Sequence, residues 1–162
     1  MAGVTIPGVL ARCHELIRHV VFVSCAIPPE GATLLDVLSP KMREFSLAIP
    51  RSPRGNSQTE EQVRAGQTYD MDESQTRFTL EIVVPEAYWP IRESVDHAGL
   101  RQPVPRTWVR LLGDRSFPPQ AQDVMAARAG CSELVDVDSG HMAMISHPQE
   151  LAEALNQIHS RR

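Results

Sequence analysis

A histidine that directly follows a short apolar run near the C-terminus constrains the fold more than any other feature of this chain. The run Glu133–Asp138 leads into Ser139-Gly140-His141, and Pro148 then opens a helical pattern. A short β-branched run that ends at a glycine predicts a buried strand followed by a turn. The sequence therefore predicts a strand, a turn that carries His141, and a helix.

The same alternation of strand and helix occurs elsewhere in the chain. Predicted strands cover Val20–Val23, Thr107–Leu112 and Leu134–Val137, and predicted helices cover Val4–Ile17, Gln120–Ala129 and Pro148–His159. Strands that alternate with helices form parallel sheets with helices on their faces. We therefore expect an α/β fold with about three parallel strands. In the last helix, Ser146 and Gln149 predict a capping box, and Leu151, Leu155 and Ile158 predict the buried stripe.

Residues 32–100 interrupt this alternation. Prolines, glycines and polar residues separate short helical pieces such as Glu60–Gly66 and Phe78–Val84, and Ser52–Gln58 has the composition of a loop. We expect residues 32–100 to form a mostly helical cap over one end of the sheet. With this insertion, residues 1–162 are predicted to form one domain.

Composition excludes several classes of function. The formal net charge of −4 gives no basic face for nucleic acid and no polybasic membrane anchor. No apolar run approaches the roughly 20 residues that a membrane-spanning helix needs. Cys13, Cys25 and Cys131 form no pair and no Cys/His cluster, so we expect reduced thiols in a cytoplasmic protein, with neither a metal nor a cofactor.

Asp114 and His141 each follow a predicted strand, and this placement raises the possibility of acid-base chemistry. Working residues of parallel sheets stand at the carboxyl ends of the strands. If the two strands are neighbours, the carboxylate of Asp114 can accept the Nδ1 hydrogen of His141 and leave Nε2 as a base. A turn aspartate and a buried or capping histidine are the alternatives that the pattern leaves open.

Three segments give the chain a family resemblance: Pro105–Asp114, Ser139–Met144 with Pro148–Leu151, and His19–Gly31. Together they resemble the C-terminal part of α/β-hydrolases, and most of all the branch of small methylesterases and hydroxynitrile lyases. The resemblance implies a cofactor-free Ser-His-Asp hydrolase of small carboxylic esters in which Asp114 and His141 are two of the three triad members.

The resemblance also implies where the third member belongs. In this family the nucleophile lies in a G-x-S-x-G turn, with the acid and then the histidine later in the chain. Met1 falls where the residue after the serine is found, and its backbone N–H would be one oxyanion donor. We therefore expect a truncated chain, inactive as it stands, that starts one residue after the serine.

Three alternatives to this interpretation remain: a different nucleophile, a lyase reaction, and a protein that binds without catalysis. Ser24 and Cys25 end a predicted strand at the correct edge but are more typical of packing residues. A lyase of the same fold is less favoured, because Met142 follows the histidine where lyases of this branch tend to carry lysine. The third alternative is a non-catalytic remnant that binds a protein or associates with itself through an exposed strand edge. Tyr88 and Trp89 are weak candidates for lining the substrate pocket.

Overall fold

A three-stranded parallel sheet forms the centre of the computed structural model, which describes residues 2–50, 52, 54–87 and 89–161. The strands are β1 (Val20–Val23), β2 (Arg106–Leu111) and β3 (Glu133–Val137), and they lie in the order β1-β2-β3. Both pairings are parallel. The predicted α/β fold with three strands is therefore confirmed, and the predicted strand ends differ from the observed ones by at most one residue.

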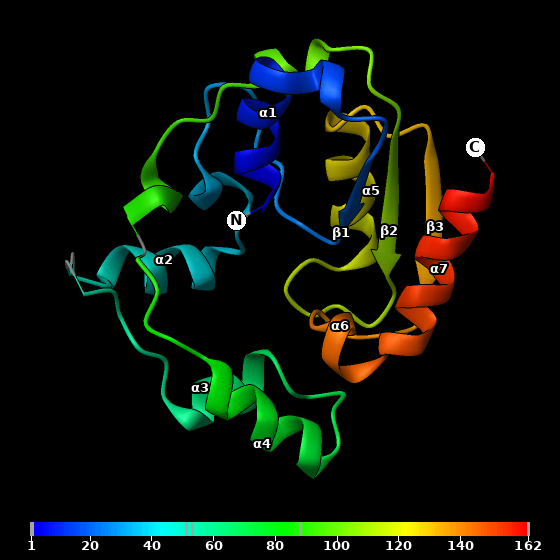
Figure 1. Ribbon diagram of the computed structural model, residues 1–162. Coiled ribbons are helices and arrows are strands. Elements are labelled where there is room, and N and C mark those ends of the chain that lie inside the picture. The colour runs from blue at the N-terminus through cyan, green and yellow to red at the C-terminus, as the bar shows by residue number, and fades with distance from the viewer. Residues whose placement is uncertain (1, 51, 53, 88, 162) are drawn as a thin grey trace.

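Helices cover both faces of this sheet (Figure 1). α5 (Pro119–Arg128) lies on one face, and α7 (Pro148–Ser160) lies on the other, preceded by the short α6 (Ala143–Ser146). α1 (Ala2–Cys13) comes before β1 and is followed by a single 3-10 turn, η1 (His14–Leu16). Because the side chains of a strand alternate between its faces, β1 and β2 contribute to both cores, whereas β3 contributes to the core on the α7 side.

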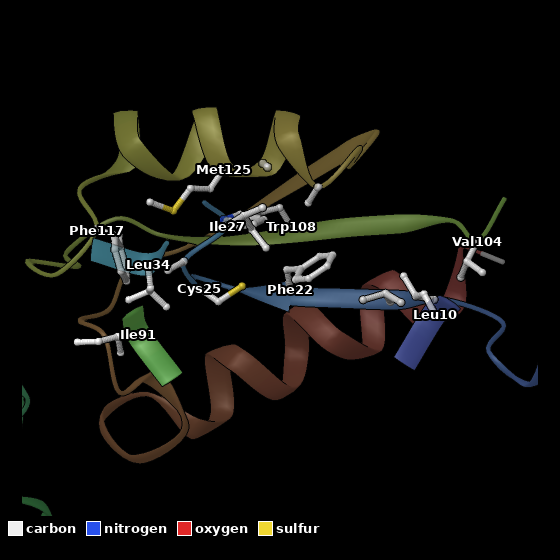
Figure 2. Close-up of a cluster of buried hydrophobic side chains, with 14 of the residues drawn as sticks. Leu10, Phe22, Cys25, Ile27, Leu34, Ile91, Val104, Trp108, Phe117 and Met125 are labelled. Carbon is white, nitrogen blue, oxygen red and sulfur yellow. The ribbon is translucent and has the colours of Figure 1, made fainter. Parts of the chain in front are cut away.

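The larger core lies between the sheet and α5. Phe22 of β1 and Trp108 of β2 stack with their ring centroids 5.8 Å apart, and Met125 of α5 belongs to the same cluster. Figure 2 shows this cluster extending along the sheet from Leu10 at one end to Phe117 at the other. The smaller core packs alternate residues of β2 and β3 against α7. Burial of large apolar side chains on both faces fixes the register of the sheet.

Residues 32–100, called the cap here, form short helices between β1 and β2. They are η2 (Leu34–Val37), α2 (Pro40–Ala48), α3 (Glu60–Gly66), α4 (Glu73–Ile82), η3 (Trp89–Arg92) and η4 (Ala98–Arg101). Figure 1 shows α3 and α4 beyond the arrowheads of the strands, next to α6. An antiparallel bridge joins Asn56 to Glu86. η4 instead packs against α1, where a Cβ at Gly99 would lie 1.8 Å from the carbonyl oxygen of Pro7.

Two predictions about how helices begin were wrong. α4 runs over Glu73–Ile82 rather than Phe78–Val84, because Asp72 and Gln75 form a capping box that starts the helix earlier. The capping box predicted for the last helix is absent: His147 is the N-cap of α7 and makes no side-chain cap bond. Instead, the hydroxyl of Ser146, the last residue of α6, donates to the carbonyl oxygen of Met142, which precedes α6.

The buried stripe of α7 also differs from the prediction. Leu151, Ala154 and Ile158 are buried, whereas Leu155 is 39% exposed. Spacings of three and four residues both keep side chains on one helical face, so the apolar pattern alone did not choose between Ala154 and Leu155.

Gln122 of α5 is a fully buried polar side chain that holds the turn after β2. Its amide oxygen accepts from the N–H of Leu111 and from the Trp108 indole, and its amide nitrogen donates to the carbonyl oxygens of Leu111 and Phe117. These bonds tie the end of β2 to the residue at which the following turn ends. Gln122 therefore fixes both ends of the turn that carries Asp114.

We expect Gln122→Met to lower the free energy of unfolding by about 3–5 kcal/mol, because it leaves several buried polar groups without partners. Chemical denaturation monitored by tryptophan fluorescence measures this change. Gln120→Met, at an exposed position of the same helix, is the matched control and should change stability by less than about 0.5 kcal/mol. Equal stability of the two variants would contradict this role of Gln122.

Candidate active site

Asp114 and His141 lie in contact at the carboxyl ends of neighbouring strands. Asp114 follows β2, His141 follows β3, and Nδ1 of His141 lies 2.7 Å from Oδ2 of Asp114. An ionised carboxylate can only accept hydrogen bonds, so Nδ1 carries the proton in this pair. The structure thus brings together the two residues on which the sequence interpretation depends.

The Asp114 carboxylate is completely buried and accepts four hydrogen bonds. Oδ2 accepts from His141 and, at 2.5 Å, from the hydroxyl of Ser24. Oδ1 accepts from the backbone N–H groups of Ser116 at 2.7 Å and Phe117 at 3.1 Å. A buried carboxylate is stable when its oxygens are saturated in this way.

This environment shifts the pKa of Asp114 downwards. Burial acts to raise the pKa of the carboxyl group, but hydrogen bonds from His141 and Ser24, the charge of the imidazole and the N–H of Phe117 together outweigh it. The pKa therefore lies below its ordinary value, and Asp114 is ionised at neutral pH. A permanently ionised carboxylate can orient an imidazole and stabilise its protonated form.

Nε2 of His141 is the atom through which the pair could act on another group. The side chain of His141 is 31% exposed, and no hydrogen bond to Nε2 occurs in the part of the chain that the structure describes. The ring of Phe117 lies against the imidazole with the ring centroids 6.0 Å apart. An imidazole held through Nδ1, with Nε2 accessible, has the arrangement of a general base.

Ser24 and Cys25 do not have the geometry of a nucleophile. The hydroxyl of Ser24 is buried and donates to Asp114 rather than facing Nε2 of His141. Ser24 also has a φ of 26°, which is uncommon for any residue except glycine. Burial raises the pKa of the Cys25 thiol to about 12, so this thiol is protonated and unreactive. The interpretation of Cys25 as a packing residue agrees with this burial, whereas Ser24 orients the acid.

The cap contributes contacts that the sequence did not reveal. Tyr69 and Asp70, between α3 and α4, hydrogen bond to the turns that carry Asp114 and His141. Gln75 of α4 donates to the carbonyl oxygens of Ile145 and Ser146. The one sequence signal near these residues was the capping box of Asp72 and Gln75. It predicts that a helix starts just after Tyr69 and Asp70, and so that these two residues lie in a turn.

An open pocket of about 400 Å³ adjoins these two turns. Its lining residues are Tyr69, Asp70, Gly113, Arg115, Asp138, Ser139, Gly140 and His147. His141 is not among the described residues that line this pocket, although its neighbours Ser139 and Gly140 are. The hydroxyl of Ser139 donates to the carbonyl oxygen of Gly140, which is a role in shaping the turn.

The remaining candidate residues lie outside this cluster. Met1 and Tyr88 are outside the described residues, and Trp89, in η3, is 43% exposed. A substrate-binding role for Trp89 stays a prediction. Within the described ranges no group of three or more His, Cys, Asp or Glu side chains could hold a metal ion. No described helix has both the length and the apolar character needed to cross a membrane.

Comparison with known proteins identifies the family. The model of the alpha/beta hydrolase family matches residues 2–154. The chain therefore belongs to the alpha/beta hydrolase family. No curated protein matches it.

Solved structures with the same fold include several esterases. An extracellular alpha/beta-hydrolase from a Paenibacillus species, described as structurally and functionally homologous to tobacco Salicylic Acid Binding Protein 2, is 16% identical with a TM-score of 0.83, over 96% of this chain and 67% of that one. The methylesterase MES16 from Arabidopsis is 17% identical with a TM-score of 0.72, over 99% and 66%. Polyneuridine aldehyde esterase is 16% identical with a TM-score of 0.70, over 97% and 68%. The chain thus spans about two thirds of the length of these structures, and the likeness establishes the fold alone.

The lowered pKa of Asp114 predicts a specific dependence of stability on pH. A carboxyl whose pKa is lower in the folded state than in the unfolded state stabilises the fold above the unfolded value, about 3.9, and loses this contribution as pH falls through the folded value. We expect Asp114→Asn to cost about 2 kcal/mol at neutral pH. The difference from the wild-type protein should shrink below about pH 4. Urea unfolding at a series of pH values measures it.

The control for this prediction is Asp138→Asn, which changes an exposed aspartate just after β3. It should leave the pH dependence of unfolding as it is in the wild-type protein. A constant difference between Asp114→Asn and the wild type from pH 7 down to pH 3 would show that the charge of Asp114 is not what stabilises this site.

Proposed function

We propose that this protein acts in the hydrolysis of small carboxylic esters through a Ser-His-Asp triad to which it contributes Asp114 and His141. The observation that carries the proposal is the contact of 2.7 Å between Nδ1 of His141 and a buried carboxylate, with Nε2 accessible. Its position at the carboxyl ends of two parallel strands is where this fold holds catalytic groups. The esterases among the structural neighbours support the choice of an ester as substrate.

In this mechanism Nε2 of His141 takes the proton of a serine hydroxyl as that oxygen attacks the ester carbonyl. Asp114 holds the imidazole and stabilises the imidazolium, which then protonates the alcohol that leaves. Water, deprotonated by His141, releases the acid from the acyl-enzyme. We assign the serine to a segment that precedes Met1, with the backbone N–H of Met1 as an oxyanion donor. On this proposal the 162-residue chain alone lacks a nucleophile and is inactive.

Hydrolysis is favoured over lyase chemistry by the residue that follows the base. Cleavage of a cyanohydrin produces cyanide, and a cationic side chain next to the base would stabilise this anion. Met142 occupies that position, and the only lysine of the sequence, Lys41, lies in α2 of the cap. The site therefore suits hydrolysis of a neutral ester better than cleavage of a cyanohydrin, which releases cyanide.

The test is to express the reading frame extended upstream of Met1 and to measure hydrolysis of p-nitrophenyl esters. We expect His141→Ala to reduce kcat by at least about 10³-fold, because it removes the general base. His159→Ala, at an exposed position of α7, should retain full activity. Equal activity of His141→Ala and His159→Ala would refute the assignment of the base. An in-frame stop codon before any G-x-S codons would refute the upstream serine.

A second candidate function is binding through the edge of β1. Within the described residues β1 has one strand neighbour, β2. The N–H groups of Val20 and Ser24 donate to the β2 side, so those of Val21 and Val23 point to the opposite edge. An apolar strand with an unpaired edge can add a strand from another chain.

If this edge is an interface, the 162-residue chain should elute as a dimer or larger species in size-exclusion chromatography with light scattering. The upstream-extended protein should be monomeric, because its additional strands would cover the edge. A compact monomer for the 162-residue chain at micromolar concentration would exclude self-association through β1.

A further inference from the structure

The hydroxyl of Tyr69 in the cap touches both turns of the candidate active site. Tyr69 lies in a turn closed by a hydrogen bond from the N–H of Met71 to the carbonyl oxygen of Thr68. Its hydroxyl accepts from the N–H of Arg115 and from the N–H of His141, both at 3.0 Å, and donates to the carbonyl oxygen of Gly113 at 3.2 Å. One donor and two acceptors are the full capacity of a phenol, so this hydroxyl is saturated.

These contacts connect backbone groups on both sides of the acid-base pair. Gly113 and Arg115 flank Asp114 in the turn after β2, whereas the third partner is the backbone of His141 itself. The two turns are also joined directly by a bond of 2.9 Å from the N–H of Gly113 to the carbonyl oxygen of Ser139. Tyr69 adds a second connection, and this one includes the residue that carries the imidazole.

Neighbouring cap residues hold the same loop. Oδ2 of Asp70 accepts from the N–H of Gly140 at 2.6 Å, and Gln75 donates to two carbonyl oxygens of α6. The guanidinium of Arg115 lies 4.3 Å from the centroid of the Tyr69 ring and packs over it. The loop that carries His141 is therefore fixed from the cap side at several points.

The chemical consequence concerns the direction of Nε2. The bond from Nδ1 to Asp114 sets the tautomer, but the direction in which Nε2 points also depends on where the backbone of His141 lies relative to Asp114. Displacement of a catalytic group by about 1 Å can cost a hundredfold in rate. A hydroxyl that holds both turns limits such displacement.

We propose that Tyr69 is a positioning residue for the Asp114–His141 pair, with its hydroxyl holding the two turns in the relation that proton transfer at Nε2 requires. On this proposal the cap contributes to the position of the acid-base pair through Tyr69. The effect on turnover rests on the proposed function, whereas the effect on the geometry of the pair does not.

The test compares Tyr69→Phe with the parent in the upstream-extended protein, by proton NMR and by ester hydrolysis. Phenylalanine keeps the ring under Arg115 and removes only the hydroxyl. We expect the low-field Nδ1 proton resonance, assigned by its loss in His141→Ala, to shift or broaden in Tyr69→Phe. We also expect kcat to fall about tenfold or more while KM stays within about twofold, as for a group that acts on the transition state.

Thr79→Val is the matched control because it also removes one hydroxyl from the cap. Thr79 is buried, and its hydroxyl donates to the carbonyl oxygen of Gln75 at 2.9 Å, with the sulfur of Met71 also nearby. Among the described residues its hydroxyl forms no hydrogen bond to either turn. This variant should lower the melting temperature at least as much as Tyr69→Phe and leave the resonance and kcat unchanged. Melting curves of both variants establish that they fold.

Three outcomes decide the proposal. The proposal is supported if the resonance changes and kcat falls in Tyr69→Phe but not in Thr79→Val. An unchanged resonance with an unchanged kcat, or equal changes in Thr79→Val, overturn it. If the parent hydrolyses no ester, the proposed function fails, and the resonance alone decides whether Tyr69 positions the pair.

Discussion

The buried carboxylate of Asp114 is the interaction on which the rest of the site depends. An ionised group with no exposed side-chain surface is tolerated only when hydrogen bonds replace its water. Its donors come from the ends of three strands: Ser24 after β1, the N–H groups of Ser116 and Phe117 after β2, and His141 after β3. The parallel strands in the order β1-β2-β3 bring these donors to one edge of the sheet. The burial of the Asp114 charge thus depends on the sheet topology, because the topology supplies the hydrogen bonds that compensate this charge.

The sequence predicted those parts of the molecule that repeat a regular pattern. Short β-branched runs marked the three strands to within a residue, and their alternation with helices indicated a parallel sheet. Strand ends of a parallel sheet share one edge, so Asp114 and His141 could be placed together without coordinates. The donors on Oδ1 could not be predicted, because backbone N–H groups exist at every position and only the folded turn selects two of them.

The cap was predictable in kind but not in its contacts. The helical pieces of residues 32–100 were expected, yet the link from Tyr69 to the turns joins residues 44 to 72 positions apart along the chain. No local pattern records such a distance, and the partners are backbone atoms that carry no sequence signal. The hydrogen bond from Ser24 to Asp114 could not be predicted for a similar reason, because a hydroxyl at a strand end gives no indication that its backbone turns it towards Asp114.

The glycines beside the acid-base pair follow from the same close packing of backbone. A Cβ at Gly113 would lie 3.0 Å from the carbonyl oxygen of Ser139, and a Cβ at Gly140 would lie 2.5 Å from Oδ1 of Asp70. One glycine lets the two turns approach each other, and the other lets the cap approach the turn with His141. A side chain at Gly113 would press on the backbone of Ser139, and a side chain at Gly140 would displace the Asp70 carboxylate that accepts from the Gly140 N–H. Glycine next to Asp114 and glycine next to His141 therefore permit the close contacts that hold the carboxylate and the imidazole together.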